Sequence, residues 1–420
     1  MVQVVHSSSA FLTVFSPLRL NKNQMKNFLI IIITLPLFIT INAQLPQTLL
    51  IDADRIEEVK KKVQQKDKHE LLLVDSLMEK ADALMRMKPI SVMDKALTPA
   101  SGSKHDYMSQ APYFWYDSTK PNGLPYMRKD GVRNPEINKI TDHKFLADLD
   151  DAARILSLTY FFTGEEKYAD KAAILLHYWF FNEDTKMNPN LEYAQAIPGV
   201  NNGRGIGIIE TRSLTGIADA VALLQGSKSW SEADTKQLQQ WYSQYLNWML
   251  TSKNGNNEHA AKNNHGTWFY VQAVDFALFT GNKEKAKQLV EETKKRLDSQ
   301  LTKEGQWPFE LERTNALGYS TFNTRAWFDL AFLAEKTSID LWHYKNTNGA
   351  SLKTAIDWLM PYALGEKNWT YQQISKYSKY DFYPLLLIAE KKFKDNRYLS
   401  LANGISKQSN DLIIELVYGN

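Results

Sequence analysis

The sequence has no cysteine among its 420 residues. Disulfide bonds, thiolate catalysis, cysteine-ligated zinc and a lipid anchor on an N-terminal cysteine are therefore excluded. The net charge is also small, at +3, which is too little to indicate a nucleic-acid partner. The eight histidines are scattered without an HxxxH pair or a histidine–carboxylate cluster. We therefore expect no metal site and no cofactor.

Long apolar runs are scarce, and the clearest one lies near the N-terminus. It covers residues 28–41, follows Lys26, contains Pro36 and ends at a small residue, Ala43. This pattern is typical of a signal peptide, and the run is too short for a comfortable membrane span. An uncleaved anchor is the less favoured alternative.

The signal peptide is expected to occupy residues 25–43. Residues 1–24 are then an upstream extension from a misassigned start codon. The remaining residues, 44–420, are expected to form one domain. We expect a protein exported to a bacterial periplasm without a stable membrane anchor.

The chain is rich in apolar and aromatic residues. Hydrophobic residues make up 44% and aromatic residues 12% of the chain, which is ample for a large core. The 11 tryptophans and 20 tyrosines suit a protein that stacks on sugar rings. A helical core rich in aromatic side chains explains them as well.

Helical periodicity dominates the chain, and no stretch shows sustained strand alternation. Within residues 143–162, Leu149, Ala152, Leu156 and Tyr160 recur at spacings of three and four. The irregular stretches 100–140 and 185–207 are rich in proline, glycine and asparagine. Helices are also predicted at 56–88, 166–182, 209–225, 232–251, 266–280, 284–301, 318–336 and 351–363.

A weak internal repeat predicts how the helices are arranged. Residues 160–172 (YFFTGEEKYADKA) resemble residues 276–288 (FALFTGNKEKAKQ), and each has an apolar helix, a Thr-Gly stop and a second amphipathic helix. The unit is a helical hairpin of about 40 residues. We predict an all-α fold, an (α/α) toroid of such hairpins. An open solenoid is the alternative, but the long polar loops favour a site built over a cup.

One polar motif, NNHGTW at 263–268, opens a predicted helix. An asparagine is a good N-cap there, which explains one of the two asparagines. A structural and a catalytic role for His265 are about equally well supported by this motif alone.

A second motif covers residues 307–320, WPFELERTNALGYS. Arg313 and Tyr319 lie six residues apart, and a guanidinium and a phenol near one loop suit an anionic substrate. The structural alternative, an Arg313 ion pair with Glu310 or Glu312 and a buried Tyr319, is the better supported when this motif stands alone.

Three loops add candidate binding residues. Residues 105–116 are polar at one end and aromatic at the other, as a sugar subsite or a buried plug would be. Residues 126–134 form a basic turn, either a lid or a solvated loop. Residues 193–212 contain Gly203-Arg204-Gly205, but no predicted strand precedes it, so a nucleotide-binding loop is rejected.

Taken together, HDYMSQAPYFW, NNHGTW and WPFELERT…LGYS resemble the alginate lyase superfamily in sequence and order. The resemblance covers residues 85–370 and is greatest to single-domain members. It implies a helical toroid that cleaves a 1,4-linked uronic-acid polymer (alginate, polymannuronate or glucuronan) by β-elimination. Its catalytic positions fall on Asn264, His265, Arg313 and Tyr319.

Elimination explains why these residue types are needed. Removal of the C5 proton creates an enolate-like dianion, which Arg313 and Asn264 would neutralise. The pKa of a phenol is about 10, and a nearby Arg313 should favour the phenolate of Tyr319. Tyr319 is then base and acid in a syn elimination. If C5–H and O4 lie on opposite faces, His265 is the better base and Tyr319 the acid.

The expected partner is an anionic polysaccharide, which side chains in the loops would position. Three aromatic residues are candidates for stacking on pyranose rings: Tyr113, Trp115 and Trp268. Five polar residues are candidates for binding flanking carboxylates: Arg128, Arg133, Gln195, Arg204 and Arg212. The expected contact set is completed by Ser109, Gln110, Tyr126 and Tyr193.

Two other functions compete with the lyase. A glycoside hydrolase needs two opposed carboxylates, drawn from Asp148, Asp150 and Asp151 or from Glu310 and Glu312. The second rival is a non-catalytic uronan-binding protein. The preferred uronate epimer, endo or exo action and the oligomeric state do not follow from the sequence.

Overall fold

The computed structural model describes residues 45–405 and 412–419, so the predicted extension and signal peptide lie outside the described residues. None of the described helices has both the length and the apolarity needed to cross a membrane. The α-helices are α1 (Ala53–Gln64), α2 (Lys68–Leu84), α3 (Asp142–Thr163), α4 (Glu166–Phe180), α5 (Leu214–Leu223), α6 (Glu232–Thr251), α7 (Lys253–His259), α8 (Asn264–Phe279), α9 (Lys283–Gln300), α10 (Pro308–Leu311), α11 (Ala316–Glu335), α12 (Leu352–Ala363), α13 (Tyr383–Phe393), α14 (Asn396–Asn403) and α15 (Leu412–Tyr418). The short elements are the strands β1 (Met108–Gln110), β2 (Phe114–Trp115), β3 (Met127–Arg128) and β4 (Tyr193–Ala196), and the 3-10 helices η1 (Val92–Asp94), η2 (Pro135–Lys139), η3 (Gly205–Ser213) and η4 (Lys379–Phe382).

Two helical hairpins carry the internal repeat. Helix α3 ends at Gly164, whose φ of 72° lets the chain turn into α4, and Gly281, with φ of 78°, does the same between α8 and α9. A side chain is strained in this left-handed conformation, whereas glycine adopts it freely. The helices of each hairpin pack against one another. Both repeat segments therefore form the expected hairpins.

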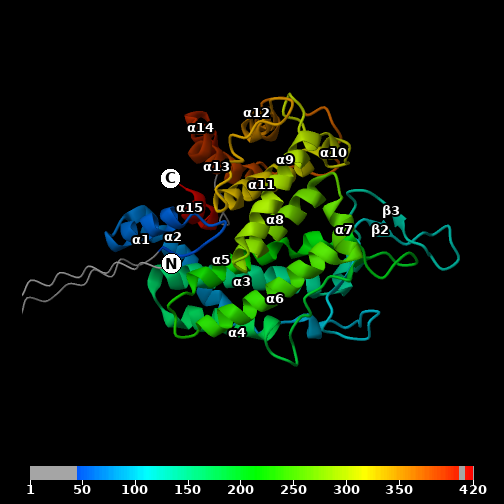
Figure 1. Cartoon of the computed structure of the whole chain (residues 1–420), viewed down its shortest axis with the longest axis horizontal. Coiled ribbons are helices and arrows are strands. Elements are labelled where there is room, and N and C mark those ends of the chain that lie inside the picture. Colours follow the sequence, from blue (N-terminus) through cyan, green and yellow to red (C-terminus); the bar gives the residue numbers. More distant parts are fainter. Residues whose placement is uncertain (1–44, 406–411, 420) are drawn as a thin grey trace, which may run out of the picture. The chain divides into compact units, whose positions relative to one another are not determined.

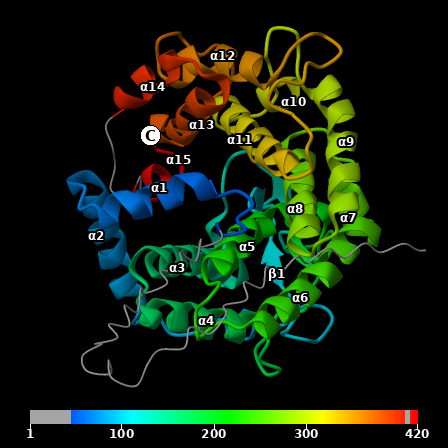
Figure 2. The ribbon, with the colours of Figure 1, turned by 60° about the vertical axis from the view of Figure 1, so that its left-hand side comes forward.

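The hairpins are arranged as an (α/α) toroid, as predicted. Figure 2 shows α4, α6, α9, α12 and α14 on the outside, with α3, α5, α8, α11 and α13 within. Along the inner layer, α3 packs on α5, α5 on α8 and α8 on α11. Helix α15 contacts α1, α2 and α13, and α2 contacts α3, so the two ends of the described chain meet (Figure 1).

The predicted helix at 56–88 is wrong in one respect, because it is two helices. Lys66 has a φ of 62°, and the Asp67 side chain accepts hydrogen bonds from the backbone amides of His69 (2.9 Å) and Glu70 (3.1 Å). An aspartate at this position caps a new helix. The predicted helix at 209–225 likewise begins in the 3-10 helix η3.

The irregular stretches contain short strands that position loops. Strand β1 pairs in parallel with β4, and β2 pairs with β3 in antiparallel register, with Phe114 opposite Arg128. These pairs bring residues 108–115 and 193–196 to the same region of the fold.

Much of the aromatic content lies in the core. Trp179, Trp307 and Trp327 are almost completely buried, and the last two rings are stacked with centroids 6.3 Å apart. The alternative explanation offered for the aromatic residues, a helical core, therefore accounts for many of them.

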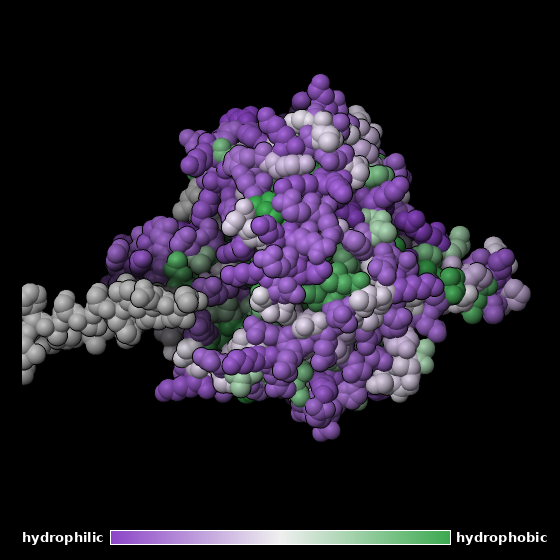
Figure 3. Space-filling view, viewed as in Figure 1, coloured by the Kyte–Doolittle hydropathy of each residue, from purple (hydrophilic) through white to green (hydrophobic). Residues whose placement is uncertain are grey.

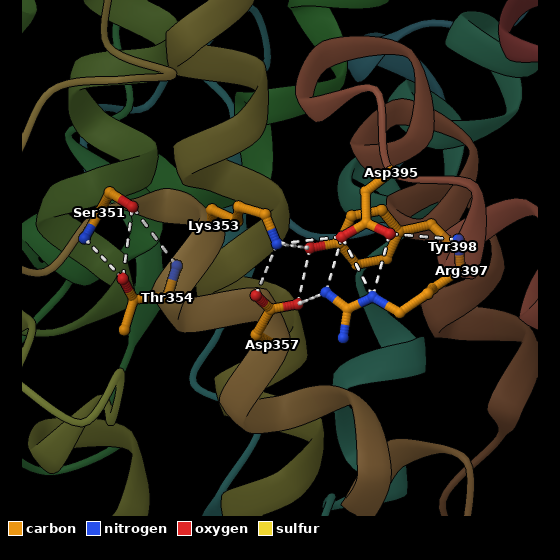
Figure 4. A network of polar contacts seen from close by, with 7 residues as sticks. All are labelled: Ser351, Lys353, Thr354, Asp357, Asp395, Arg397 and Tyr398. Atoms are coloured by element: carbon orange, nitrogen blue, oxygen red, sulfur yellow. Dashed lines mark hydrogen bonds and ion pairs between the residues drawn. The ribbon is translucent and has the colours of Figure 1, made fainter.

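A polar network fastens α12 to α14. Lys353 donates to Asp357 (2.8 Å) and to Asp395 (3.2 Å), and Arg397 reaches both carboxylates. Figure 4 shows these side chains facing one another between the two helices, with the hydroxyl of Tyr398 among them. The network joins the outer helices α12 and α14 to each other.

A buried carboxylate anchors the first described residues to the inner layer. Asp219 on α5 accepts hydrogen bonds from the backbone amides of Leu49 (2.5 Å), Leu50 (3.0 Å) and Ile51 (2.7 Å). These amides precede α1 and have this side chain as their acceptor. One carboxylate therefore fixes the start of the domain to its centre.

We predict that Asp219→Ala lowers the free energy of unfolding by roughly 2–4 kcal/mol, because buried amides lose their acceptor. Urea unfolding followed by circular dichroism measures this loss. The matched control is Asp148→Ala, which removes an exposed partner of Lys144 and should change stability by less than about 1 kcal/mol. Equal effects of both substitutions would contradict the anchoring role.

Candidate active site

The N-terminus of α8 places two polar side chains side by side. Asn263 is the N-cap, and its side chain accepts a hydrogen bond from the amide of His265 (3.3 Å). The capping role predicted for one asparagine therefore belongs to Asn263. Its neighbour Asn264 is left for other contacts.

Asn264 is held by a buried carboxylate from α10. Its backbone amide donates to Oε1 of Glu310 and its Nδ2 donates to Oε2, each at 2.6 Å. The Oδ1 atom of Asn264 is buried and has no hydrogen-bond partner in the protein. Because Asn264 is only 1% exposed, this oxygen is an unpaired polar atom inside the protein.

His265 is oriented by a second buried carboxylate. Its Nδ1 lies 2.7 Å from Oε1 of Glu258, whose side chain is 1% exposed, whereas the His265 side chain is 16% exposed. A carboxylate acceptor places the ring proton on Nδ1. In the neutral ring, Nε2 then carries the lone pair and can accept a proton.

Arg313 pairs with a loop residue distant in the sequence. Its Nε donates to Oδ2 of Asp130 (3.1 Å) and its Nη2 donates to Oδ1 (2.9 Å). The structural alternative, a pair with Glu310 or Glu312, is therefore not the arrangement in the structure. Asp130 lies 183 residues earlier in the chain.

The guanidinium of Arg313 also covers the ring of Tyr319. Its central carbon lies 3.9 Å from the ring centroid. The Tyr319 hydroxyl is 2.8 Å from the hydroxyl of Tyr113. The predicted arginine–phenol pair therefore exists, with Tyr113 as a third member.

From the sequence we expected Arg313 to favour the phenolate of Tyr319, but the structure favours the phenol. Burial raises the pKa of Tyr319, and the hydrogen bond with Tyr113 adds to the rise, although the charge of Arg313 acts in the opposite direction. Burial removes water that would solvate the phenolate, and this effect outweighs the cation. Tyr319 is accordingly a phenol at neutral pH.

Glu310 connects three of the four residues, Asn264, His265 and Arg313. It bonds Asn264 directly, and the charges of Arg313 and His265 also act on it. Burial nevertheless raises the pKa of Glu310 to about 7. Helices α8 and α11, which carry the two motifs, pack against each other. Asn264, His265, Arg313 and Tyr319 thus share one region of the toroid.

A second polar chain lies beneath the loop of β1 and β4. Ser109 donates to Glu210 (2.6 Å) and accepts from the amide of Gln195 (2.8 Å), whose side chain in turn accepts from Arg204 (2.8 Å). Burial lowers the pKa of Arg204 to about 10. These three predicted binding residues are therefore brought together by bonds to one another.

Gln110 and Tyr193 lie on the paired strands β1 and β4. The Nε2 atom of Gln110 is buried without a hydrogen-bond partner in the protein, and its residue lines a cavity of about 490 Å³ with Asn201 and Asn202. This cavity adjoins the Ser109 chain.

The loop that carries β2 and β3 holds the remaining lid candidates. Trp115 Nε1 donates to the carbonyl of Val132 (2.8 Å), Tyr126 donates to Glu136 (2.8 Å) and Arg128 donates to Asp130 (2.7 Å). Figure 3 shows apolar patches on the projection that carries these strands. Its exposed apolar side chains are Tyr116, Leu124, Met127 and Val132, and Arg133 is exposed as well.

Two predicted binding residues point elsewhere. Trp268 is 6% exposed and its ring packs against Phe322, with centroids 5.0 Å apart. Arg212 also lies over Phe322 and, with Asp150, lines an interior cavity of about 350 Å³. The stacking role expected for Trp268 is not supported by this position, because the indole is used in packing.

The carboxylates proposed for a hydrolase differ in their exposure and in their partners. Asp148 is exposed beside Lys144, whereas Asp150 is buried in the interior cavity. Glu310 is buried and bonded to Asn264, while Glu312 is exposed. Among the described residues, no cluster of three or more acidic or histidine side chains is arranged to hold a metal ion.

Sequence reasoning missed the supporting carboxylates. Glu258 and Asp130 were not singled out, and Glu310 was considered only as a hydrolase acid or an arginine partner. Glu258 belongs to the separate short helix α7, seven residues before His265. No spacing rule identifies such a pair, because the bend between α7 and α8 creates it.

The chain resembles known proteins in sequence and in fold. The family model described as alginate lyase matches residues 91–369. The structure of an alginate lyase from Bacteroides ovatus is 38% identical, with a TM-score of 0.85 over 89% of this chain and 99% of that chain. None of the curated protein sequences compared with the chain matches it.

More distant structures share the fold. A variant of alginate lyase A1-III complexed with a tetrasaccharide is 14% identical, with a TM-score of 0.56 over 90% of this chain and 97% of that chain. Alginate lyase A1-III from Sphingomonas species A1 is 15% identical, with a TM-score of 0.52 over 81% and 94% of the two chains.

Proposed function

This chain belongs to the alginate lyase family and is a polysaccharide lyase, and from that premise we propose that Asn264, His265, Arg313 and Tyr319 are its catalytic residues. One observation carries the proposal. The guanidinium of Arg313 lies 3.9 Å from the centroid of the Tyr319 ring, and its charge acts on the Glu310 carboxylate that binds Asn264. A cation, a phenol, an amide and an imidazole are thus available to one sugar ring.

Arg313 and Asn264 are proposed to bind the substrate carboxylate. Asp130 engages one edge of the guanidinium, which leaves Nη1 for a second anion. The second N–H of Asn264 is a neutral donor for the same group. These donors stabilise the dianion that forms as the C5 proton leaves.

Tyr319 is proposed to protonate the departing O4 oxygen. Its raised pKa keeps the phenol protonated, which suits an acid better than a base. His265, with Nδ1 fixed by Glu258, presents Nε2 as the base for C5 when C5–H and O4 lie on opposite faces. When both lie on the same face, Tyr319 must lose its proton before it can act as the base.

The sugar chain is proposed to lie along the loops of β1 to β4. Tyr113 and Trp115 supply aromatic rings, and Arg128, Arg133 and Arg204 supply charge for flanking carboxylates. Ser109, Gln110, Tyr126, Tyr193 and Gln195 complete the proposed contacts. We also propose export through the signal peptide at 25–43, which leaves 44–420 as a single lyase domain.

Product chemistry tests the substrate. We predict that the purified chain, mixed separately with polymannuronate, polyguluronate and glucuronan, produces ultraviolet-absorbing 4,5-unsaturated ends with at least one of them. Product lengths distinguish endo from exo action. New reducing ends without absorbance would indicate a hydrolase, and binding without any cleavage would indicate a binding protein.

Tyr319→Phe is predicted to lower kcat by about 10²–10⁴-fold, because the proton carrier is lost. Ultraviolet absorbance measures the rate, and calorimetry with a uronate oligosaccharide should show that binding is retained. Tyr344→Phe is the control, since Tyr344 lies in a distant loop over Lys294. A Tyr319→Phe variant with more than about a tenth of wild-type kcat would contradict the assignment.

The titration of Glu310 leads us to predict that kcat depends on pH. Because its pKa is about 7, it is ionised above that pH and accepts both Asn264 donors, whereas below it one oxygen carries a proton. We expect kcat to fall as pH drops through about 7. Glu310→Gln should lower kcat by roughly tenfold or more and abolish this acid limb.

Rate profiles between pH 5 and 9 test this dependence. The control is Glu312→Gln, which makes the same substitution at a nearby, exposed glutamate. An unchanged acid limb in Glu310→Gln would show that another group titrates there.

A further inference from the structure

Asp130 contacts the guanidinium of Arg313 along one edge. Its two oxygens accept from Nε and Nη2 at 3.1 Å and 2.9 Å, which is a side-on bidentate pair. An arginine has five N–H donors in a plane, so Nη1 and the second hydrogen of Nη2 remain. The opposite edge can therefore bind another carboxylate without displacing Asp130.

The position of Asp130 is itself fixed by several donors. Its Oδ2 accepts from the backbone amide (3.4 Å) and the hydroxyl (3.1 Å) of Thr314, and its Oδ1 accepts from Arg128 (2.7 Å). The next residue, Gly131, has φ of 73°, and a Cβ there would lie 2.4 Å from the Thr314 hydroxyl. This close approach holds the loop against the turn that precedes α11.

Arg313 is thus constrained on two sides. Asp130 holds one edge, and the Tyr319 ring covers one face. We infer that Asp130 is a positioning residue that aims the free edge of Arg313 at the substrate carboxylate, an inference that rests on the proposed function. A loop 183 residues away from the arginine therefore completes the catalytic geometry.

The ionisation of Asp130 is consistent with its proposed role in positioning Arg313. Burial pushes the pKa of Asp130 up, but the hydrogen bond and charge of Arg313 bring it down to about 2. Asp130 is therefore ionised at every pH at which the enzyme is assayed. Its negative charge also raises the pKa of Tyr319, which helps to keep the phenol protonated.

The test compares Asp130→Ala and Asp130→Asn with the control Asp117→Asn. Asp117 lies in the same loop region and is partly exposed, and its side chain accepts hydrogen bonds from the amide and hydroxyl of Thr119. Steady-state kinetics are measured by ultraviolet absorbance on a uronan that the wild type cleaves. Thermal unfolding of each variant checks its fold.

We expect Asp130→Ala to lower kcat by about 100-fold, as a misplaced catalytic group does, with a smaller change in KM. Asp130→Asn keeps one oxygen acceptor, so its kcat should be about tenfold higher than that of Asp130→Ala. Asp117→Asn should match the wild type in all three measurements.

Other outcomes overturn the inference. A kcat equal to or above wild type with a lower KM in Asp130→Ala would mean that Asp130 competes with the substrate for Arg313. A loss of the fold in both Asp130 variants would mean a purely structural role. Failure of the proposed function is separate, since it would appear as an active Tyr319→Phe variant or a wild type without unsaturated product.

Discussion

The pair of hydrogen bonds between Glu310 and Asn264 is the interaction on which the site depends. It joins the first residue of α8 to the short helix α10, so that the two polar motifs share one fixed geometry. The positive end of the α8 dipole favours a carboxylate at this place. Without the carboxylate, two buried donors would lose their acceptor, at a cost of about 1–3 kcal/mol each.

The helical architecture could be predicted because it is encoded in local patterns. Spacings of three and four identify the amphipathic helices, and the Thr-Gly stops mark Gly164 and Gly281 as turns with positive φ. The break at Lys66 escaped prediction because charged residues continue the helical pattern across it. Helices α13 to α15 escaped because each is short, and their packing against α1 and α2 follows only from closure of the ring.

The candidate site could be predicted from the sequence only in part. Its four proposed catalytic residues follow from the resemblance of local motifs to the alginate lyase superfamily. Their carboxylate partners do not, since Asp130 reaches Arg313 across 183 residues and Glu258 reaches His265 across a bend between helices. Trp268 is a different case, and its predicted contact with sugar stays a prediction. A tryptophan next to a polar motif resembles a sugar platform, but its place in the α8 turn directs the ring towards Phe322.

Burial is the main reason that Tyr319 stays protonated, and the contacts around Arg313 modify its effect. The guanidinium lies over the ring face, while the hydroxyl is bonded to Tyr113, so the cation does not contact the oxygen that would carry the negative charge. The charge of Asp130 acts against that of Arg313 and also raises the pKa of Tyr319. A substrate carboxylate beside Arg313 would add a further negative charge and stabilise the phenol still more. The arrangement is therefore consistent with the proposal that Tyr319 donates a proton to O4 and that Nε2 of His265 accepts the C5 proton.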